Sequence, residues 1–239
     1  MSSVPSSDGR VDLSHLRKPY RDSSEAVKED ALPSLNPVKL FENWFNLVKE
    51  SESVYEPNAV CVSTVNAEGR PSSRMVLLKG FGDDGFRFFT HYTSQKGREL
   101  EQNPNIALLF YWDSFNRQVR IEGKAHKLPQ EDVEAYFKRR PKTSQLGAAI
   151  SDQCSLISDR KALMDRYHAL EKKIGDGDVP KPEKWGGFLV VPDKFEFWQG
   201  NTDRVHDRLI FRKSGPNETI NPQLTKPAEN CWVLERMLP

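Results

Sequence analysis

The sequence lacks the features of a membrane or secreted protein. It has no apolar run close to the roughly 18 to 20 residues that a membrane helix needs. Its beginning, MSSVPSSDGR, has neither the charged start nor the apolar stretch of a secretion signal. The three cysteines, Cys61, Cys154 and Cys231, are an odd number without the spacing of a metal site. We therefore expect free thiols, no bound metal and a cytoplasmic protein without membrane contact.

The sequence also lacks an excess of either charge. Lysine and arginine number 35 against 34 acidic residues, which gives a formal net charge of +1. Because a balanced chain has no general attraction for a polyanion, we expect no nucleic acid partner. A site for an anionic ligand must instead be a local cluster of cations. Asn217 fits a glycosylation acceptor, but the expected compartment argues against its use.

The chain of 239 residues is long enough to bury one substantial core. Residues 1–30 are polar and without periodicity, which predicts a flexible arm, and residues 31–239 are predicted to form a single domain. From Pro37 onward, apolar residues such as Leu40 and Trp44 recur at steps of three and four. This spacing predicts a helix with one face in the core.

Short β segments separated by turn residues make up most of the remaining chain. Several meet at turns that contain glycine or asparagine, which favours antiparallel hairpins in a barrel or sandwich. Because helical segments are set apart from these strands, the pattern indicates an α+β fold. The predicted strands are residues 59–65, 73–79, 86–92, 106–111, 118–124, 187–191, 194–198, 209–213 and 231–236, and the further predicted helices are residues 94–102, 130–139, 144–150 and 159–173.

Gly80, Gly82 and Gly85 match the pattern G-x-G-x-x-G of dinucleotide-binding loops. Such a loop must open a helix so that free N–H groups face the phosphate, whereas the next residues, FRFFTHY, are typical of a strand. Asp83 and Asp84 would also repel a pyrophosphate. We therefore predict a hairpin turn rather than a cofactor loop.

The segment RMVLLKGF, which begins at Arg74, has a cation toward each end of an apolar strand. Strand alternation points Arg74 and Lys79 to opposite faces unless a bulge intervenes, so each could serve a different anion. Lys96 lies in the first turn of a helix that begins near Ser94, where the helix dipole also favours an anion. Arg74 and Lys96 form one candidate set, although a solvated position explains Lys96 equally well.

A second candidate set surrounds the end of the helix at residues 130–139. Tyr136 and Arg140 are four residues apart, hence on one face, and Pro141 stops the helix. Ser144 lies near the start of the next helix, so a cation and a hydroxyl could converge on one phosphate. An ordinary exposed helix end is the stronger alternative for the sequence KRRPK.

The segment GNTDRVHDR offers a third set. If it is extended, Arg204, His206 and Arg208 lie on one side, where three potential cations repel one another unless an anion lies nearby. This favours a ligand. A lone histidine is more often structural, although its titration near neutrality suits proton handling. The indole of Trp198, just upstream, could form the wall of a site for a planar ring.

These motifs resemble the pyridoxine (pyridoxamine) 5'-phosphate oxidase family, from about Leu13 to Pro239. The resemblance implies an antiparallel FMN-binding split β-barrel with surrounding helices, which forms a homodimer with FMN at the subunit interface. The implied FMN contacts are Arg74, Met75, Val76, Leu77, Phe89, Thr90, Gln95, Lys96, Gln118, Gln153, Cys154, Trp198 and Arg208. The implied substrate contacts are Lys79, Tyr136, Arg140, Ser144, Arg204 and His206, with the arm around Arg21 to Ser24 closing over them.

The implied reaction is oxidation of pyridoxine 5'-phosphate or pyridoxamine 5'-phosphate by dioxygen. It gives pyridoxal 5'-phosphate and hydrogen peroxide, with ammonia from the amine. Arg204 is expected against the substrate ring and His206 at its oxygen substituents. Two positions depart from the family pattern, because S-R-K-G has Gln95 here and Q-S-S has Cys154. The loss of a cation and a hydroxyl donor predicts weaker FMN binding.

Two other functions fit parts of the pattern. A split-barrel flavin reductase would need the FMN contacts but not Tyr136, Arg140, Ser144, Arg204 and His206 together, and their joint presence argues against it. A non-enzymatic carrier of pyridoxal 5'-phosphate would use the substrate contacts without redox chemistry. Reduction of the flavin by pyridoxine 5'-phosphate without oxygen would distinguish the oxidase from the carrier.

Overall fold

The computed structural model describes residues 13, 16, 20, 26–215 and 218–239. Asn217 and the segment from Arg21 to Ser24 lie outside these residues. Near the end of the predicted arm, the backbone N–H of Val27 donates to the carboxylate of Asp207 at 2.9 Å, and a short 3-10 helix, η2 (Glu29–Ala31), follows. Residues 26–30 are thus held against the sheet, and the division of the chain at residue 30 stays a prediction.

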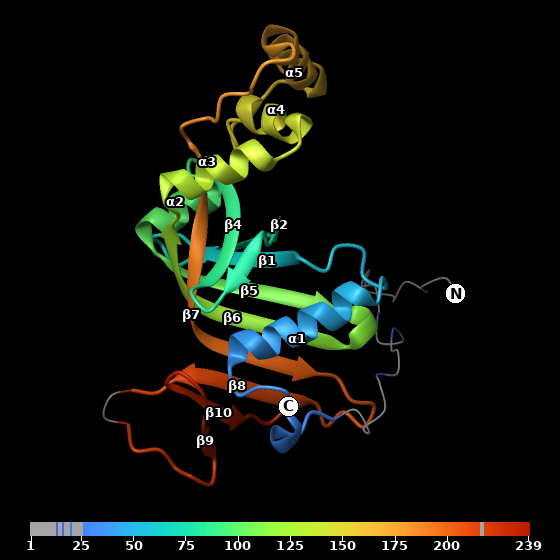
Figure 1. Ribbon diagram of the computed structural model, residues 1–239, viewed down its shortest axis with the longest axis vertical. Coiled ribbons are helices and arrows are strands. Elements are labelled where there is room, and N and C mark those ends of the chain that lie inside the picture. Colours follow the sequence, from blue (N-terminus) through green and yellow to red (C-terminus); the bar gives the residue numbers. More distant parts are fainter. Residues whose placement is uncertain (1–12, 14–15, 17–19, 21–25, 216–217) are drawn as a thin grey trace, which may run out of the picture.

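The described residues form an antiparallel sheet of ten strands with helices at its sides (Figure 1). Its order is β2-β1-β5-β6-β7-β8-β10-β9, and β4 pairs with both β3 and β7. The predicted α+β class is therefore confirmed. The strands are β1 (Ala59–Val65), β2 (Pro71–Leu77), β3 (Gly80–Gly82), β4 (Gly85–His91), β5 (Asn105–Trp112), β6 (Arg117–Lys127), β7 (Trp185–Gln199), β8 (Asp207–Lys213), β9 (Thr225–Pro227) and β10 (Trp232–Arg236).

Strand β7 connects two parts of the sheet. The half that begins at Trp185 pairs with β4, and the half that ends at Gln199 pairs with β8, while β6 follows β7 through both halves. In Figure 1, β7 descends from the helical end of the molecule and bends into the lower strands. A partner change of this kind lets one strand belong to two sides of a barrel.

The bend lies at a β-bulge. The register between β6 and β7 shifts at Gly123, which is opposite Pro192, while Glu122 is opposite Lys194. A Cβ atom at Gly123 would lie 2.1 Å from the carbonyl oxygen of Val191, so only glycine permits this close approach. The prediction of two strands, 187–191 and 194–198, is wrong, because both segments belong to β7. Pro192 does not end the strand because it lies at the bulge, where a proline is tolerated.

Helix α1 (Pro37–Glu50) closes one side of the barrel. It packs Leu40, Phe41 and Trp44 into the core, and the ring of Phe41 lies 5.0 Å from that of Phe110 in β5. The side chain of Asn36 accepts hydrogen bonds from two N–H groups of the first turn, at 2.9 and 3.3 Å, and so caps the helix. The predicted helix and its core-facing stripe are confirmed.

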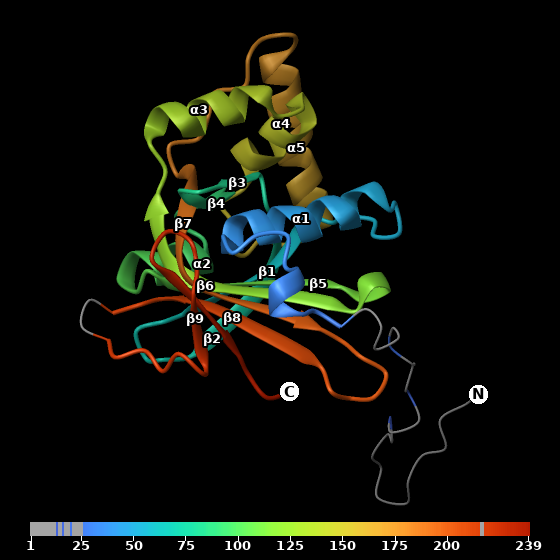
Figure 2. The ribbon, with the colours of Figure 1, turned by 60° about the horizontal axis from the view of Figure 1, so that its bottom comes forward.

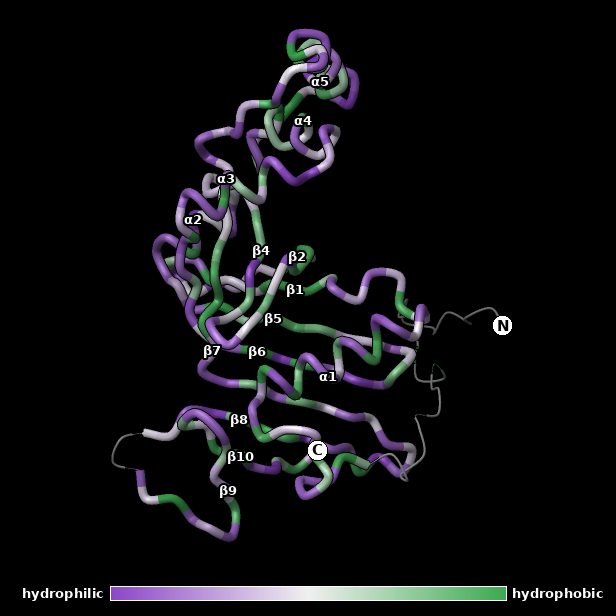
Figure 3. The backbone as a smooth tube through the Cα atoms, viewed as in Figure 1, coloured by the Kyte–Doolittle hydropathy of each residue, from purple (hydrophilic) through white to green (hydrophobic). Residues whose placement is uncertain are grey.

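The other helices lie away from α1. Figure 2 shows α3, α4 and α5 gathered at one end of the molecule, and in Figure 3 the hydrophobic stretches follow strands such as β1 and β5. A second apolar cluster includes Val133 and Phe137 of α3, Leu146 of α4 and Trp185 at the start of β7. No helix in the described residues is long and apolar enough to cross a membrane. These helices are α2 (Gln95–Gln102), α3 (Gln130–Arg139), α4 (Lys142–Ile150) and α5 (Arg160–Ile174).

The pattern G-x-G-x-x-G lies at a hairpin, as predicted. Gly80 and Gly82 lie in β3, which pairs with β4, and Gly85 opens β4 with φ at +134°. A side chain there would be strained and would meet the carbonyl oxygen of Val190 at 2.2 Å. These glycines thus serve the turn. The short strands β3 and β9 were not predicted, because three residues are too few to show alternation.

The capping residue of α1 provides a stability test. We expect Asn36→Ala to lower the free energy of unfolding by about 1 kcal/mol or more, because two N–H groups near the core lose their acceptor. Urea unfolding at fixed protein concentration measures the change. Asn43→Ala is the matched control, because Asn43 is exposed on the same helix, and its effect should stay within about 0.5 kcal/mol. Equal losses would show that the cap contributes nothing specific.

Candidate functional site

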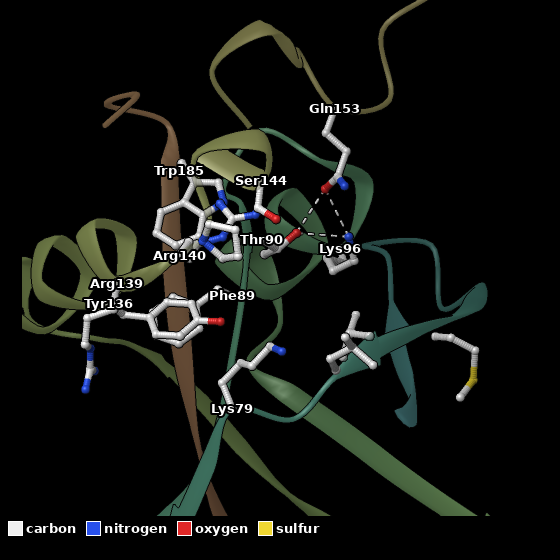
Figure 4. Close-up of a pocket in the computed structure, with 14 residues that line it drawn as sticks. Lys79, Phe89, Thr90, Lys96, Tyr136, Arg139, Arg140, Ser144, Gln153 and Trp185 are labelled. Carbon is white, nitrogen blue, oxygen red and sulfur yellow. Dashed lines mark hydrogen bonds between the residues drawn. The ribbon is translucent and has the colours of Figure 1, made fainter. Parts of the chain in front are cut away.

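A cavity of about 540 Å³ lies beside β2 and beneath α3 and α4 (Figure 4). Strand β2 is the last strand at one end of the sheet order, so within the described residues one of its edges has no strand partner. The cavity thus has exposed backbone on one side and helix ends on another. Its lining residues are Met75, Val76, Leu77, Lys79, Phe89, Thr90, Lys96, Tyr136, Arg139, Arg140, Pro141, Ser144, Gln153 and Trp185.

Lys96 is a buried cation on this cavity, with 7% of its surface exposed. Its Nζ atom donates to Oγ1 of Thr90 at 3.0 Å and to Oε1 of Gln153 at 3.2 Å. Burial lowers the pKa of Lys96 below 10.5, and the charge of Arg74 lowers it further. Among the described residues, Lys96 belongs to no ion pair, so its charge is hydrogen-bonded but not neutralised. The alternative of a solvated surface position is wrong.

Arg140 is another cavity cation that lacks a carboxylate partner in the described chain. Its Nη1 atom is buried without a hydrogen bond, and burial lowers its pKa. Helix α3 ends at Arg139, and Arg140 takes an extended conformation because Pro141 follows. Arg140 is thus a capping residue rather than a helical one, yet it still lines the cavity together with Tyr136.

Aromatic rings form one wall of the cavity. The rings of Phe89 and Tyr136 stack at 3.9 Å, and the indole of Trp185 lies 5.4 Å from Phe89 at an angle of only 10°. Burial raises the pKa of Tyr136, so its hydroxyl stays protonated and can donate a hydrogen bond. In Figure 4 this hydroxyl, the amine of Lys79 and the hydroxyl of Ser144 surround the same space.

Arg74 is directed elsewhere and does not line the cavity. Its guanidinium donates to the hydroxyls of Thr64 and Ser72, each at 2.6 Å, and pairs with Glu99 at 3.5 Å. Burial would raise the pKa of Glu99, but hydrogen bonds from Thr64, Ser72 and Gln95 outweigh it and hold the pKa below its ordinary value. Arg74 therefore already has an anionic partner, and Lys79 lies beyond the end of β2 on the cavity side.

The two positions that depart from the family pattern lie next to each other. The backbone N–H of Gln95 is 3.5 Å from Sγ of Cys154, and the side-chain amide of Gln95 donates to Glu99 at 2.9 Å. Neither residue lines the cavity, but their neighbours Lys96 and Gln153 do. All three cysteines are free, as predicted.

A second group of implied site residues lies on the lower strands, and none of its members lines the cavity. Gln118, Trp198 and Arg208 are neighbours across β6, β7 and β8. The ring of His206 lies 5.0 Å from that of Trp198, and Nε of Arg208 donates to Glu196 at 2.9 Å. We call Gln118, Trp198, Arg204, His206 and Arg208 the lower group.

The segment between Gly200 and Asp207 is a turn rather than a strand. Arg204 has φ at +67°, and Nδ1 of His206 accepts a hydrogen bond from the N–H of Asn201 at 3.1 Å. The prediction that alternation aligns Arg204 and His206 with Arg208 is therefore wrong, although the turn keeps them close to Trp198. The ring of Tyr20 covers this turn, 5.4 Å from His206 and 5.3 Å from the Arg204 guanidinium.

The cavity and the lower group lie toward opposite ends of β7. Trp185 lines the cavity and Trp198 belongs to the lower group, and β7 has 15 residues. At about 3.3 Å per residue, a strand of this length follows a path of roughly 50 Å. The lower group is therefore separated from the cavity along β7, and none of its members lines the cavity. Arg21, the remaining implied contact, lies outside the described residues.

Sequence reasoning missed three residues that line the cavity: Arg139, Pro141 and Trp185. Arg139 and Pro141 flank the predicted Arg140, so proximity alone could have found them. Trp185 had only a weak signal, because an aromatic residue at the start of a strand is usually part of the core.

The buried charge of Lys96 should cost stability when no anion is bound. At neutral pH we expect ligand-free Lys96→Met to exceed the wild type in unfolding free energy by roughly 1 kcal/mol. Because folding lowers the pKa of Lys96, the folded protein binds fewer protons there than the unfolded chain. The difference should therefore shrink as the pH rises toward 10.5.

Inorganic phosphate should raise the thermal midpoint of the wild type more than that of Lys96→Met, because the variant lacks the buried cation. Lys49→Met, at an exposed position of α1, is the control and should respond like the wild type. Equal stabilisation of all three proteins by phosphate would contradict an anion site at Lys96.

Two family models match the chain. Residues 48–175 match the family described as pyridoxamine 5'-phosphate oxidase, and residues 185–239 match the pyridoxine 5'-phosphate oxidase C-terminal dimerisation region. The pyridoxine-5'-phosphate oxidase of Bos taurus is 48% identical over 231 residues, which cover 96% of this chain and 88% of the relative. The pyridoxine/pyridoxamine 5'-phosphate oxidase of Leptospira biflexa is 47% identical over 206 residues, with coverages of 86% and 95%.

Solved structures support the same assignment. PhzG from Burkholderia lata, solved with tetrahydrophenazine-1-carboxylic acid, superposes with a TM-score of 0.78 at 27% identity and covers 90% of this chain and 98% of its own. A pyridoxamine 5'-phosphate oxidase-related, FMN binding protein from Nostoc punctiforme has a TM-score of 0.62 at 18% identity, with coverages of 86% and 99%, and supports the fold alone. The split-barrel fold is confirmed, and the chain belongs to the pyridoxamine 5'-phosphate oxidase family.

Proposed function

We propose that this protein uses FMN and dioxygen to oxidise pyridoxine 5'-phosphate and pyridoxamine 5'-phosphate to pyridoxal 5'-phosphate. Hydrogen peroxide, and ammonia from the amine, would be the other products. The main observation is that a buried cation, Lys96, and a half-buried one, Arg140, whose Nη1 atom is buried, line one cavity without a carboxylate partner in the described chain. A cavity of this kind suits phosphate monoesters, which bring about 1.5 to 2 negative charges each. The relatives named above point to the same chemistry.

The residues present fit FMN. Lys96, with Thr90 and Gln153 bonded to its amine, would hold the FMN phosphate close to the start of α2, where the helix dipole adds to the attraction. Met75, Val76 and Leu77 would support the flavin from the unpaired side of β2. When bound, FMN supplies the hydride acceptor and the reaction with dioxygen. Gln95 and Cys154 would contribute less than a cation and a hydroxyl, which is consistent with the predicted weaker FMN binding.

Four side chains on the same cavity would hold the substrate phosphate: Lys79, Tyr136, Arg140 and Ser144. Two of them are cations and two are hydroxyl donors. Hydrogen bonds to a charged group are worth about 1.5–3 kcal/mol each, so together these four would fix the substrate against the flavin. Arg139 lines the cavity too, but in Figure 4 its side chain is directed away from the other cations.

We propose that the lower group completes the site of the other subunit in a homodimer, with FMN at the interface. The lower group lies toward the other end of β7 and does not line the cavity of its own chain, and all its members except Gln118 fall in residues 185–239, which match the dimerisation region. The sheet face opposite α1 exposes Met75 and Tyr111, so an apolar surface is available for a second chain. The three free cysteines support a reducing compartment such as the cytoplasm.

Within that dimer, Arg204 and His206 would contact the reacting substrate. Because Nδ1 of His206 accepts a hydrogen bond from Asn201, a neutral His206 carries its proton on Nε2. Nε2 can therefore donate to an oxygen substituent of the substrate. The positively charged guanidinium of Arg204 would lie against the substrate ring and stabilise electron density in that ring. A separate general base is not assigned.

Anaerobic mixing tests the proposed function. The FMN-loaded protein should lose its yellow colour when pyridoxine 5'-phosphate is added without oxygen, and air should restore it. Pyridoxine without phosphate should react far less efficiently, because it lacks hydrogen bonds worth about 1.5–3 kcal/mol each. Binding of pyridoxine 5'-phosphate without any loss of colour would instead indicate a carrier.

Mixed dimers test the shared site. Arg140→Ala removes a cavity cation and Arg204→Ala removes a member of the lower group, so each variant alone should be nearly inactive. A purified heterodimer of the two has one intact site, and we expect about half of the wild-type activity. The control pairs Arg140→Ala with Ser144→Ala, both in the cavity, and should stay inactive. If the first heterodimer is equally inactive, then the lower group does not complete the partner's site.

A further inference from the structure

Arg140 is held by aromatic rings rather than by an acid. Its guanidinium carbon lies 4.9 Å from the centre of the Trp185 ring and 5.8 Å from that of Phe137. No ion pair and no side-chain hydrogen bond of Arg140 occurs among the described residues, and its Nη1 atom is buried without a partner. Of these two rings, the indole of Trp185 is the closer to the guanidinium, within the range of a cation–π contact.

Trp185 is itself fixed from several sides. Only 4% of its surface is exposed, and it pairs with His91 at the start of β7. The ring of Phe89 stacks on it at 5.4 Å, and the ring of Phe137 meets it edge-on at 5.0 Å. Phe89 in turn stacks on Tyr136. One rigid indole thus supports, directly or through Phe89, two of the side chains proposed to hold the substrate phosphate.

The choice of an aromatic partner has an electrostatic reason. A carboxylate beside Arg140 would neutralise its charge and compete with an incoming phosphate. The face of an indole attracts a cation but carries no net charge, so the guanidinium keeps its full charge. Arg74 shows the opposite case in the same protein, because it pairs with Glu99 and does not line the cavity.

We propose that Trp185 is a positioning residue, which holds the Arg140 guanidinium in the cavity, still charged and oriented for the phosphate group of the substrate. This inference rests on the proposed function, which places that phosphate at Arg140. It assigns to Trp185 an indirect role in substrate binding, because the side chain of Trp185 offers no charge to the phosphate and acts through Arg140.

Two substitutions at this position test the proposal. Trp185→Leu removes the aromatic face, and we expect the KM for pyridoxine 5'-phosphate to rise about 10-fold with kcat changed by less than about 3-fold. The Kd of pyridoxal 5'-phosphate, measured by calorimetry on the FMN-loaded protein, should rise by a similar factor. Trp185→Phe keeps an aromatic face, and both constants should stay within about 3-fold of the wild type.

The chain offers a matched control for the loss of a buried indole. Trp232 is 5% exposed and also lies against a cation, Lys213, whose Nζ atom is 4.1 Å from its ring, but this pair is remote from the cavity lining. Trp232→Leu should lower the thermal midpoint about as much as Trp185→Leu does. Its KM and Kd should remain those of the wild type. If Trp232→Leu raises KM as much as Trp185→Leu does, then the effect is general destabilisation and the proposal is wrong.

A double-mutant cycle separates positioning from packing. In an Arg140→Ala background the guanidinium is gone, so adding Trp185→Leu should change the Kd of pyridoxal 5'-phosphate by less than about 2-fold. A full 10-fold effect in that background would show that Trp185 acts independently of Arg140 and would overturn the proposal.

Failure of this inference differs from failure of the proposed function. If the wild type is reduced by pyridoxine 5'-phosphate while Trp185→Leu keeps wild-type KM and Kd, the function stands and the positioning role falls. If the wild type binds pyridoxal 5'-phosphate but is never reduced, the oxidase function falls. A raised Kd for Trp185→Leu would then still support the role of Trp185 in phosphate binding.

Discussion

The arrangement of the site depends on positive charge that the protein buries without neutralising it. Lys96 is buried with two neutral hydrogen-bond partners, and the half-buried Arg140 lies against an indole. Each cation is less stable there than in water, and the lowered pKa of both groups is a sign of that cost. An anion that enters the cavity removes the cost, so affinity for phosphate and instability of the empty site have the same physical origin.

The second constraint is the bend in β7. The bulge opposite Gly123 turns the strand from one side of the barrel to the other, and the cavity and the lower group lie on either side of this bend. In the proposed dimer, the two ends of β7 would present two halves of a site that face different directions. A symmetric pair of chains would bring one cavity and one lower group together at each of two sites, so a separation within one chain is compatible with a compact site in the assembly.

Local sequence patterns predicted most of the elements, because their causes are local. The stripe from Leu40 to Trp44, the hairpin glycines and the stop at Pro141 each act within a few residues. The prediction of two strands in place of β7 was wrong because a bulge depends on pairing with the neighbouring strand. The alternation of residues within one segment holds no information about that pairing. The turn at Arg204 was missed for a related reason, since a positive φ in a non-glycine residue is imposed by tertiary contacts.

The candidate site was predictable as a set of residue types but not as an arrangement. Arg74 and Lys96 looked alike in the sequence, as two cations near strand and helix ends. Only the structure reveals that Glu99 already pairs with Arg74, while Lys96 keeps its charge free for a ligand. Whether a cation serves a ligand or the fold is decided by the acid nearest to it in space. In this protein the four cations that line the cavity, Lys79, Lys96, Arg139 and Arg140, form no ion pair with a carboxylate in the described chain.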